Sequence, residues 1–311
     1  MAGLTDIDYV LAKLRWMETS RIWPNGERYL WTDAFGVVLL VSLYRHLNEP
    51  KYLAQADAVV SAVERVLGRP RGIRIGEAAD RDGQYFHYLS MWLYALAVLG
   101  RYRPEYTQRG VALVRQIHDA FVIPHRGVVW KMREDLSGPY PGYGFGALDA
   151  FDGYVAYQLL DPHALAREID AMRTLIDTTY RELHITQDLG IGMMLWLSHF
   201  FPDEPWARMQ RTRCLETLAG MWCGDRYFCR EPGARDTKFA FTNYGVSIGL
   251  QAVGARQEQV AALNEFFDGY RSGDEYDREA ITHVMACSSH FPGLLLADNF
   301  AGAGSPDSPH D

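Results

Sequence analysis

The sequence predicts an all-α protein whose 311 residues form a single (α/α)6 toroid, that is, six helical hairpins closed into a ring. Three observations support this prediction. Helical periodicity of the apolar residues runs along almost the whole chain, and strand patterns are scarce. Two kinds of helical segment alternate, one charged on one face and the other uncharged. The alternation repeats six times, and consecutive elements are usually neighbours in space, so each charged segment is expected to pair with the next uncharged one.

The charged segments are amphipathic and are expected on the outside of the ring. The first has an apolar stripe at Ile7, Val10, Leu14 and Met17. The same helical spacing recurs around residues 53–67, 111–121, 165–176, 204–222 and 260–270. The opposite face of each segment carries Arg, Asp, Glu or Gln, which indicates that this face is in water.

The uncharged segments are expected on the inside. They are residues 34–44, 84–100, 153–160, 189–201, 239–254 and 280–297. A helix that is apolar all round is either buried or spans a membrane. Most of these segments are shorter than the roughly 20 residues that a span needs, and His, Asn and Gln interrupt them. The alternative of an open solenoid is disfavoured because no fixed repeat period is found.

Composition limits the function. The chain has 31 basic and 39 acidic residues, a net charge of −8, and no basic stripe, which argues against nucleic acid as a partner. Residues 1–300 are expected to form the toroid, and residues 301–311, which are small, polar and Pro-rich, a disordered tail. Residues 1–18 lack the pattern of a signal peptide, so a cytoplasmic enzyme is expected.

The four cysteines suggest neither a metal site nor a disulfide. Cys214, Cys223, Cys229 and Cys287 form no CxxC pair and have no His at a zinc-finger offset. Reduced thiols are the expected state, and no cofactor is predicted, because no phosphate-binding glycine loop or metal motif is present.

The connections that lead into the uncharged segments are long and rich in Gly, aromatic and charged residues. In a ring of hairpins these connections meet at one mouth, where the positive ends of the inner-helix dipoles converge. We expect a funnel there, because binding and catalysis usually occur on loops carried by a rigid scaffold. Its aromatic rings could stack on sugars or stabilise a carbocation. The expected substrate contacts are Trp23, Tyr29, Trp31, Arg74, Asp82, Tyr85, Trp130, Lys131 and Tyr154.

Five residues near the starts of inner helices are the catalytic candidates: Asp33, His87, Asp149, Asp152 and Asp188. Asp is also favoured at a helix start as a cap, and a His inside a helix is often a hydrogen-bonded core residue. Several carboxylates at one mouth favour at least one acid–base pair, which glycosidic bond cleavage requires. Asp149 and Asp152 share a helix face, so each can raise the pKa of the other.

The motifs resemble a known group of proteins. They read Arg-Tyr-Leu-Trp-Thr-Asp-Ala-Phe-Gly at 28–36, Arg-Ile-Gly at 74–76, Gly-Gln-Tyr-Phe-His-Tyr-Leu at 83–89, Trp-Lys-Met at 130–132, Asp-x-x-Asp-Gly-Tyr at 149–154 and Asp-Leu-Gly at 188–190. Over residues 23–249 the chain resembles the six-hairpin glycosidase-like proteins, which include unsaturated glucuronyl hydrolases and sugar 2-epimerases. The resemblance implies an (α/α)6 toroid with a funnel-shaped site.

Three functions follow as hypotheses. The first is an enzyme that acts on a small-molecule carbohydrate or glycoside, as a hydrolase or an epimerase, by carboxylate and His acid–base chemistry. The second is a cyclase or isomerase of a terpenoid-like intermediate, in which Asp82 would protonate the substrate; the usual DDxxD and DxDD motifs are missing. The third is a non-catalytic toroidal binding protein. The substrate and the oligomeric state are left open.

Overall fold

The computed structural model describes residues 6–222 and 235–303. The chain divides into two compact units. Unit 1 consists of residues 1–27 and 176–292, and unit 2 of residues 28–175 and 293–311. The chain passes from one unit to the other at three points, and one of these, between residues 175 and 176, lies within helix α7 (Ala166–Thr179).

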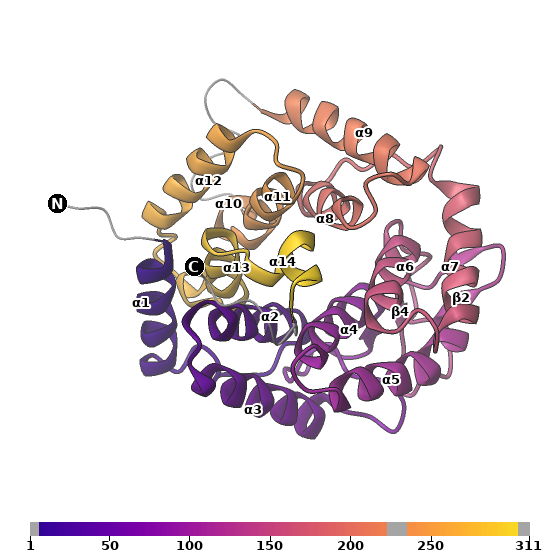
Figure 1. Cartoon of the computed structure of the whole chain (residues 1–311), viewed down its shortest axis with the longest axis horizontal. Coiled ribbons are helices and arrows are strands. Elements are labelled where there is room, and N and C mark those ends of the chain that lie inside the picture. The colour runs from indigo at the N-terminus through magenta and orange to yellow at the C-terminus, as the bar shows by residue number, and fades with distance from the viewer. Residues whose placement is uncertain (1–5, 223–234, 304–311) are drawn as a thin grey trace. The chain divides into compact units, whose positions relative to one another are not determined.

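Unit 2 is built from pairs of helices that differ in burial. Helix α2 (Leu30–Leu47), which contains the uncharged segment 34–44, packs against α3 (Pro50–Leu67) and α4 (Phe86–Gly100), as Figure 1 shows. α4 also packs against α5 (Glu105–Phe121) and α6 (Asp149–Leu160). α2 is buried without interruption from Leu30 to Leu43, whereas α3 and α5 bury only one face. This difference is the one that the two kinds of segment predict.

Unit 1 repeats this arrangement. α11 (Phe241–Ala252) packs against α8 (Asp188–His199), α12 (Gln257–Gly269) and α13 (Ala280–His290). α8 also contacts α9 (Pro205–Met221), and α13 contacts α1 (Asp6–Thr19). The short helices α10 (Arg235–Lys238) and η1 (Glu275–Arg278) precede α11 and α13.

Glycines bring the backbones of α8 and α11 together. A Cβ atom on Gly192 would lie 2.3 Å from the carbonyl oxygen of Gly245, and one on Gly249 would lie 2.2 Å from that of Gly192. Both distances are far below van der Waals contact, so any side chain at these positions would push the helices apart.

The prediction of one helix over residues 280–297 is wrong. α13 ends at His290, and the 3₁₀ turn η2 (Gly293–Leu295) and helix α14 (Ala297–Ala301) follow it. Pro292 has no backbone N–H and disfavours helical geometry in the residue before it. Gly293, with a φ of 50°, then takes a left-handed conformation that ends helices.

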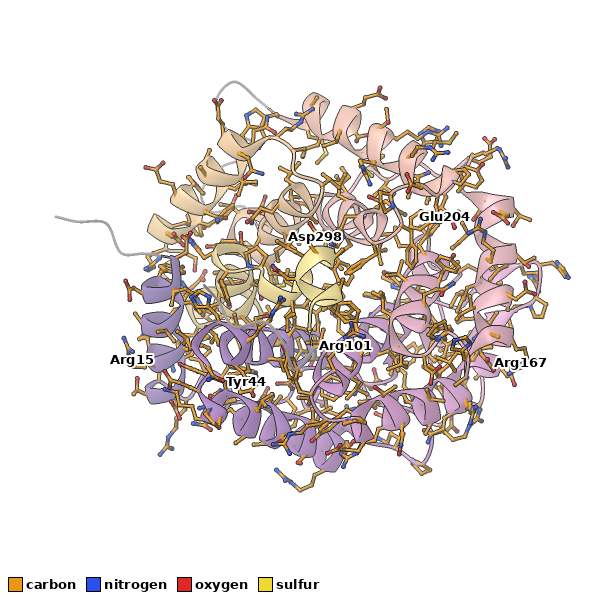
Figure 2. The ribbon with its side chains drawn as sticks, in the orientation of Figure 1. Arg15, Tyr44, Arg101, Arg167, Glu204 and Asp298 are labelled. Carbon is orange, nitrogen blue, oxygen red and sulfur yellow. The ribbon has the colours of Figure 1, made fainter. Side chains whose placement is uncertain are left out.

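Side chains of unit 2 fasten α14 to the helices around it. The guanidinium of Arg101 lies over the ring of Phe300, 4.9 Å from its centroid, and donates to the carbonyls of Phe300 and Ala301. Figure 2 labels Arg101 together with Asp298 of α14 and Tyr44 of α2. Tyr44 packs edge-on against Tyr102, which follows Arg101 in the chain, with ring centroids 5.4 Å apart.

The long insertion before α6 forms paired backbone structure. β2 (Val122–Ile123) pairs with β3 (Gly127–Val128), and β4 (Lys131–Met132) pairs with β1 (Gln84–Tyr85), both antiparallel. Further along the loop, Tyr140 donates its backbone N–H to the Lys131 carbonyl. The insertion is therefore folded back over the start of α4.

Other predictions concern single residues and the termini. Cys214 and Cys287 are buried free thiols, and Cys223 and Cys229 lie outside the described residues. Of the predicted tail, residues 304–311 also lie outside them. Within the ranges 6–222 and 235–303, no helix combines the length and the hydropathy that are needed to cross a membrane.

Candidate functional site

The starts of α2, α4 and α6 meet within unit 2. The ring of Trp31 on α2 lies 5.8 Å from that of His87 and 5.2 Å from that of Tyr88, both on α4. On the α6 side, the backbone N–H of His87 interacts with the carboxyl group of Asp149. The expected gathering of inner-helix starts is thus present among the three inner helices of this unit.

His87 is held in one tautomer. The indole Nε1–H of Trp130 donates to Nδ1 of His87 over 3.1 Å, so Nδ1 carries the lone pair and the ring proton sits on Nε2. Burial among the surrounding rings lowers the pKa of His87 to about 3. At neutral pH the partly exposed ring is therefore an uncharged hydrogen-bond donor at Nε2.

Asp149 and Asp152 form a buried carboxyl pair on the first turn of α6. Their side chains are only 3% and 7% exposed. Burial, and then the charge of Asp152, raise the pKa of Asp149 well above its ordinary value. Burial raises the pKa of Asp152 to about 8. The pair therefore retains a proton at neutral pH, which is what a carboxyl group must do to act as an acid.

Hydrogen bonding to the carboxyl pair is sparse. Oδ2 of Asp149 lies against Gly146, where a Cβ atom would come within 1.7 Å of it, so only glycine fits in the loop at this point. Oδ1 of Asp149 has no hydrogen-bond partner in the part of the chain that the structure describes. Within the same ranges, no residue hydrogen bonds to the carboxyl group of Asp152. A carboxyl group that the protein leaves unbonded is available to a ligand.

Asp33 lies in the same unit, but its carboxylate already forms an ion pair with an arginine. Its Oδ1 accepts from the Nη1 of Arg28 over 2.9 Å, and the two side chains are 0% and 4% exposed. The backbone of Arg28 is fixed in turn, because its N–H donates to the carboxylate of Glu77. A buried ion pair of this kind is costly to break, so Asp33 is better suited to holding the start of α2 than to exchanging protons.

Asp188 lies in unit 1, where its carboxylate also accepts hydrogen bonds from the protein. Oδ1 accepts the backbone N–H of Leu189 over 2.9 Å, and Oδ2 accepts the hydroxyl of Thr242 over 3.1 Å. The side chain ties the start of α8 to the start of α11. Asp188 lies in the first turn of α8, whose N-cap residue is Gln187 and carries no side-chain cap, so Asp188 is a first-turn carboxylate and not a cap.

Aromatic rings form a continuous wall beside His87. Tyr85 stacks on Trp130 with centroids 5.5 Å apart and planes at 28°, and Trp130 packs against Tyr143 at 5.3 Å. The hydroxyl groups of Tyr29 and Tyr88 hydrogen bond to each other. Trp130 is 40% exposed, so one of its faces is open to solvent.

Charged groups line the end of this wall. The Nζ of Lys131 lies 3.8 Å from the ring centroid of Tyr140 and 3.3 Å from Oδ1 of Asp82. The hydroxyl of Tyr140 donates to Oδ2 of Asp82 over 2.7 Å. The Tyr140 and Lys131 hydrogen bonds hold the pKa of Asp82 below its ordinary value. Asp82 is therefore an ionised acceptor.

Four predicted substrate contacts are buried or are already bonded within the protein, so they present little surface to a ligand. Trp23 is 1% exposed and lies in unit 1, so it offers no ring face to solvent. Arg74 pairs with Glu134 over 2.6 Å and donates to carbonyls of its own loop. Tyr154 is 5% exposed, and its hydroxyl accepts from Arg173. Trp31 is 2% exposed, and its Nε1–H has no acceptor in the described ranges.

Two residues of the site were not anticipated. Tyr88 packs against Trp31 and hydrogen bonds to Tyr29, and its only signal in the sequence is its position next to His87. Arg28 neutralises Asp33 from outside the helix, and the five-residue spacing between them is not a helical contact spacing. No group of three or more His, Cys, Asp or Glu among the described residues is arranged to hold a metal ion.

No family model matches this sequence, and no curated protein matches it in sequence. Solved structures do match in fold. The chain is similar to a GH76 α-mannanase from Bacteroides thetaiotaomicron, with a TM-score of 0.68, 10% identity, and 94% of this chain and 98% of that one covered. A D-mannose isomerase matches with a TM-score of 0.63, 12% identity, and 93% and 99% coverage.

A cellobiose 2-epimerase from Spirochaeta thermophila matches with a TM-score of 0.61, 13% identity and 86% coverage of both chains. At these identities the likeness establishes the fold alone. The prediction of an all-α (α/α)6 toroid fold is therefore confirmed.

Proposed function

We propose that this protein is a carbohydrate-processing enzyme of the acid–base type, with its site at the starts of α2, α4 and α6. The observation that carries the proposal is the Asp152 carboxyl group, which is buried, protonated at neutral pH and not hydrogen bonded by any described residue. An exposed aromatic wall lies along the start of α4, and aromatic faces pack well on the apolar faces of sugars.

Hydrolysis of a glycosidic bond is the reaction that the carboxyl pair favours. The two carboxyl groups titrate as a pair. One of them would donate its proton to the departing oxygen, and the other, in its ionised form, would activate water or stabilise the positive charge on the sugar. The fold of the GH76 α-mannanase supports this choice of substrate class.

Isomerisation or epimerisation of a sugar is the second candidate, and His87 favours it. An imidazole that stays neutral and donates from Nε2 can polarise a carbonyl oxygen while a carboxylate moves the proton on the neighbouring carbon. The Trp130 hydrogen bond and the lowered pKa hold His87 in that state. As a general base at Nδ1, His87 would first have to lose the bond from Trp130.

The cyclase hypothesis has less support. It requires Asp82 to be a proton donor, but the Tyr140 and Lys131 contacts favour the ionised form of Asp82. We therefore propose Asp82 as a polar contact and not as an acid.

The first experiment is product analysis with the purified chain on α-mannan, D-mannose and cellobiose, which are named in the structurally similar enzymes. New reducing ends indicate hydrolysis, and a change of sugar identity at constant chain length indicates isomerisation. The variant Asp152→Asn is expected to lower kcat by about 10²–10⁴-fold, the usual contribution of a general acid.

The matched control is Asp170→Asn, which changes an exposed Asp of α7 in the same unit. It should leave turnover unchanged. Full activity of Asp152→Asn would contradict the catalytic role of the carboxyl pair. Saccharide binding without any product, in the wild-type chain, would favour the non-catalytic binding protein.

A further inference from the structure

An open cavity lies beyond the aromatic wall, at the loop that contains β4. Its volume is ≈ 500 Å³, which is within the range that holds small ligands. Its lining residues are polar or aromatic with one exception, and they are Asp82, Arg133, Glu134, Asp135, Tyr140 and Pro141.

Two of the three carboxylates in the cavity are neutralised by neighbours. Asp82 is paired with Lys131, as described above. Glu134 accepts from Arg69 over 2.8 Å and pairs with Arg74 over 2.6 Å. The cavity therefore has no excess of negative charge, although its lining is rich in acidic residues.

The remaining two charged groups supply one donor and one acceptor. Arg133 is exposed, and its guanidinium donates to no group in the part of the chain that the structure describes. Asp135, also exposed, accepts the backbone N–H of Ser137 and is ionised. Vicinal hydroxyl groups of a sugar both donate and accept, so they match this combination better than a simple anion or cation would.

The wall connects this cavity to His87 without a break. Tyr140 packs edge-on against Tyr143 at 5.8 Å, Tyr143 packs against Trp130 at 5.3 Å, and Trp130 donates to His87. The exposed face of Trp130 is the open part of this path. A chain of sugars could therefore lie over Trp130 with one end beside His87 and the other in the cavity.

We propose that the cavity at β4 is a second sugar subsite, formed chiefly by Arg133, Asp135 and Tyr140, and that the substrate is an oligosaccharide of two or more residues that lies across Trp130. The inference rests on the proposed function, because it extends the same site away from the carboxyl pair.

Calorimetric titration of the full chain tests the inference. The probes are D-mannose, an α-linked mannobiose, an α-linked mannotetraose, glucose, cellobiose and cellotetraose. The chain carries Asp152→Asn, so that turnover does not consume the probe. In the preferred series, the oligosaccharides should bind about tenfold more tightly than the monosaccharide, the gain expected from one additional pair of hydrogen bonds with stacking.

Variants of the cavity locate that gain. Arg133→Ala and Asp135→Asn should each weaken oligosaccharide binding by about 2- to 10-fold and leave the monosaccharide affinity unchanged. Arg126→Ala is the control, because Arg126 lies on the neighbouring β2–β3 hairpin, where it packs on Phe145 and does not line the cavity. It should alter neither affinity.

The outcomes separate this inference from the proposed function. Equal affinity for short and long saccharides, no binding of any probe, or cavity variants that behave like Arg126→Ala would each overturn the subsite. Tighter binding with length but no product from the wild-type chain would leave the subsite in place and contradict only the enzymatic proposal.

Discussion

The two units place ionisable side chains at the starts of uncharged helices, but the surroundings of these groups differ. In unit 1, Asp188 accepts two hydrogen bonds, and His283 donates from Nε2 to the carbonyl of Asp277 over 2.9 Å. In unit 2, Asp149 and Asp152 are more deeply buried, and the described residues leave Asp152 without a hydrogen bond. A helix start therefore does not by itself distinguish a structural acid from a candidate site, and the lack of hydrogen bonds to Asp152 supports the proposed site in unit 2.

A second cluster in unit 1 makes the contrast stronger. Asp268 accepts from Tyr9 over 2.6 Å and bonds to Nε2 of His290 over 2.8 Å, while Nδ1 of His290 lies 3.2 Å from Asp6. Lys13 donates to the Tyr9 hydroxyl. These partners join α1, α12 and α13, so the ionisable groups here stabilise packing.

The largest expected effect concerns the stability of the chain as a function of pH. Asp152 has a folded-state pKa of about 8, above its unfolded value, so the folded state holds more protons between these two values. Its contribution to the free energy of unfolding is then lost as the pH rises toward 8. Asp152→Asn removes this loss. We therefore compare the unfolding free energy of the variant with that of the wild type at two pH values. Between about pH 5 and about pH 9, this difference should change in favour of the variant by about a few kcal/mol.

Denaturant unfolding at both pH values measures this difference, with Asp170→Asn as the control that should follow the wild type. Parallel behaviour of wild type and Asp152→Asn would mean that the carboxyl group is solvated, and the contrast between the two units would disappear.

The sequence predicted the helices well because their signal is periodic and local. Each predicted segment has a helix at its position: α1, α3, α5, α7, α9 and α12 for the charged kind, and α2, α4, α6, α8, α11 and α13 for the uncharged kind. The error over residues 280–297 has a local cause too. Charge is absent from this segment because it is buried, so composition alone does not reveal that Pro292 and Gly293 divide it.

The site was predicted less completely, since it depends on contacts between distant residues. The spacing of Asp149 and Asp152 predicts mutual repulsion, but the larger cause of their raised pKa values is burial, which spacing does not show. The same limit applies to Trp23. Its position in a long aromatic-rich connection suggests a rim residue, and only the packing of unit 1 shows that it is buried.

The next prediction tests whether the Asp268 cluster stabilises unit 1. Burial alone would raise the pKa of Asp268, but hydrogen bonds from His290 and Tyr9 hold it below its ordinary value. Burial likewise opposes the charged form of His290, yet the carboxylates of Asp268 and Asp6 raise its pKa overall. Asp268→Asn should cost about 1–3 kcal/mol of unfolding free energy, the usual effect of removing one partner from a charged hydrogen-bonded group.

The pH dependence of that cost has a definite sign. The contribution of Asp268 is lost as the pH falls through its lowered pKa, and that of His290 is lost as the pH rises through its raised pKa. The destabilisation by Asp268→Asn should therefore be greatest in mildly acidic solution, between the two pKa values, and smaller at alkaline pH. A cost that does not vary with pH would show that the ion pair contributes nothing.

The smallest expected effect is that of Asp188→Asn, and it tests the contrast directly. An amide keeps one acceptor for Leu189 or Thr242 but loses the charge at the start of α8, so the expected cost is about 0.5–1.5 kcal/mol of stability. Turnover per folded molecule should be unchanged, because the carboxylate is already used within unit 1. Thermal unfolding and kcat, measured on the same preparation, separate the two effects. A large fall in kcat at unchanged stability would make Asp188 a catalytic residue, and satisfied hydrogen bonds would then no longer distinguish the acids of unit 1 from those of unit 2.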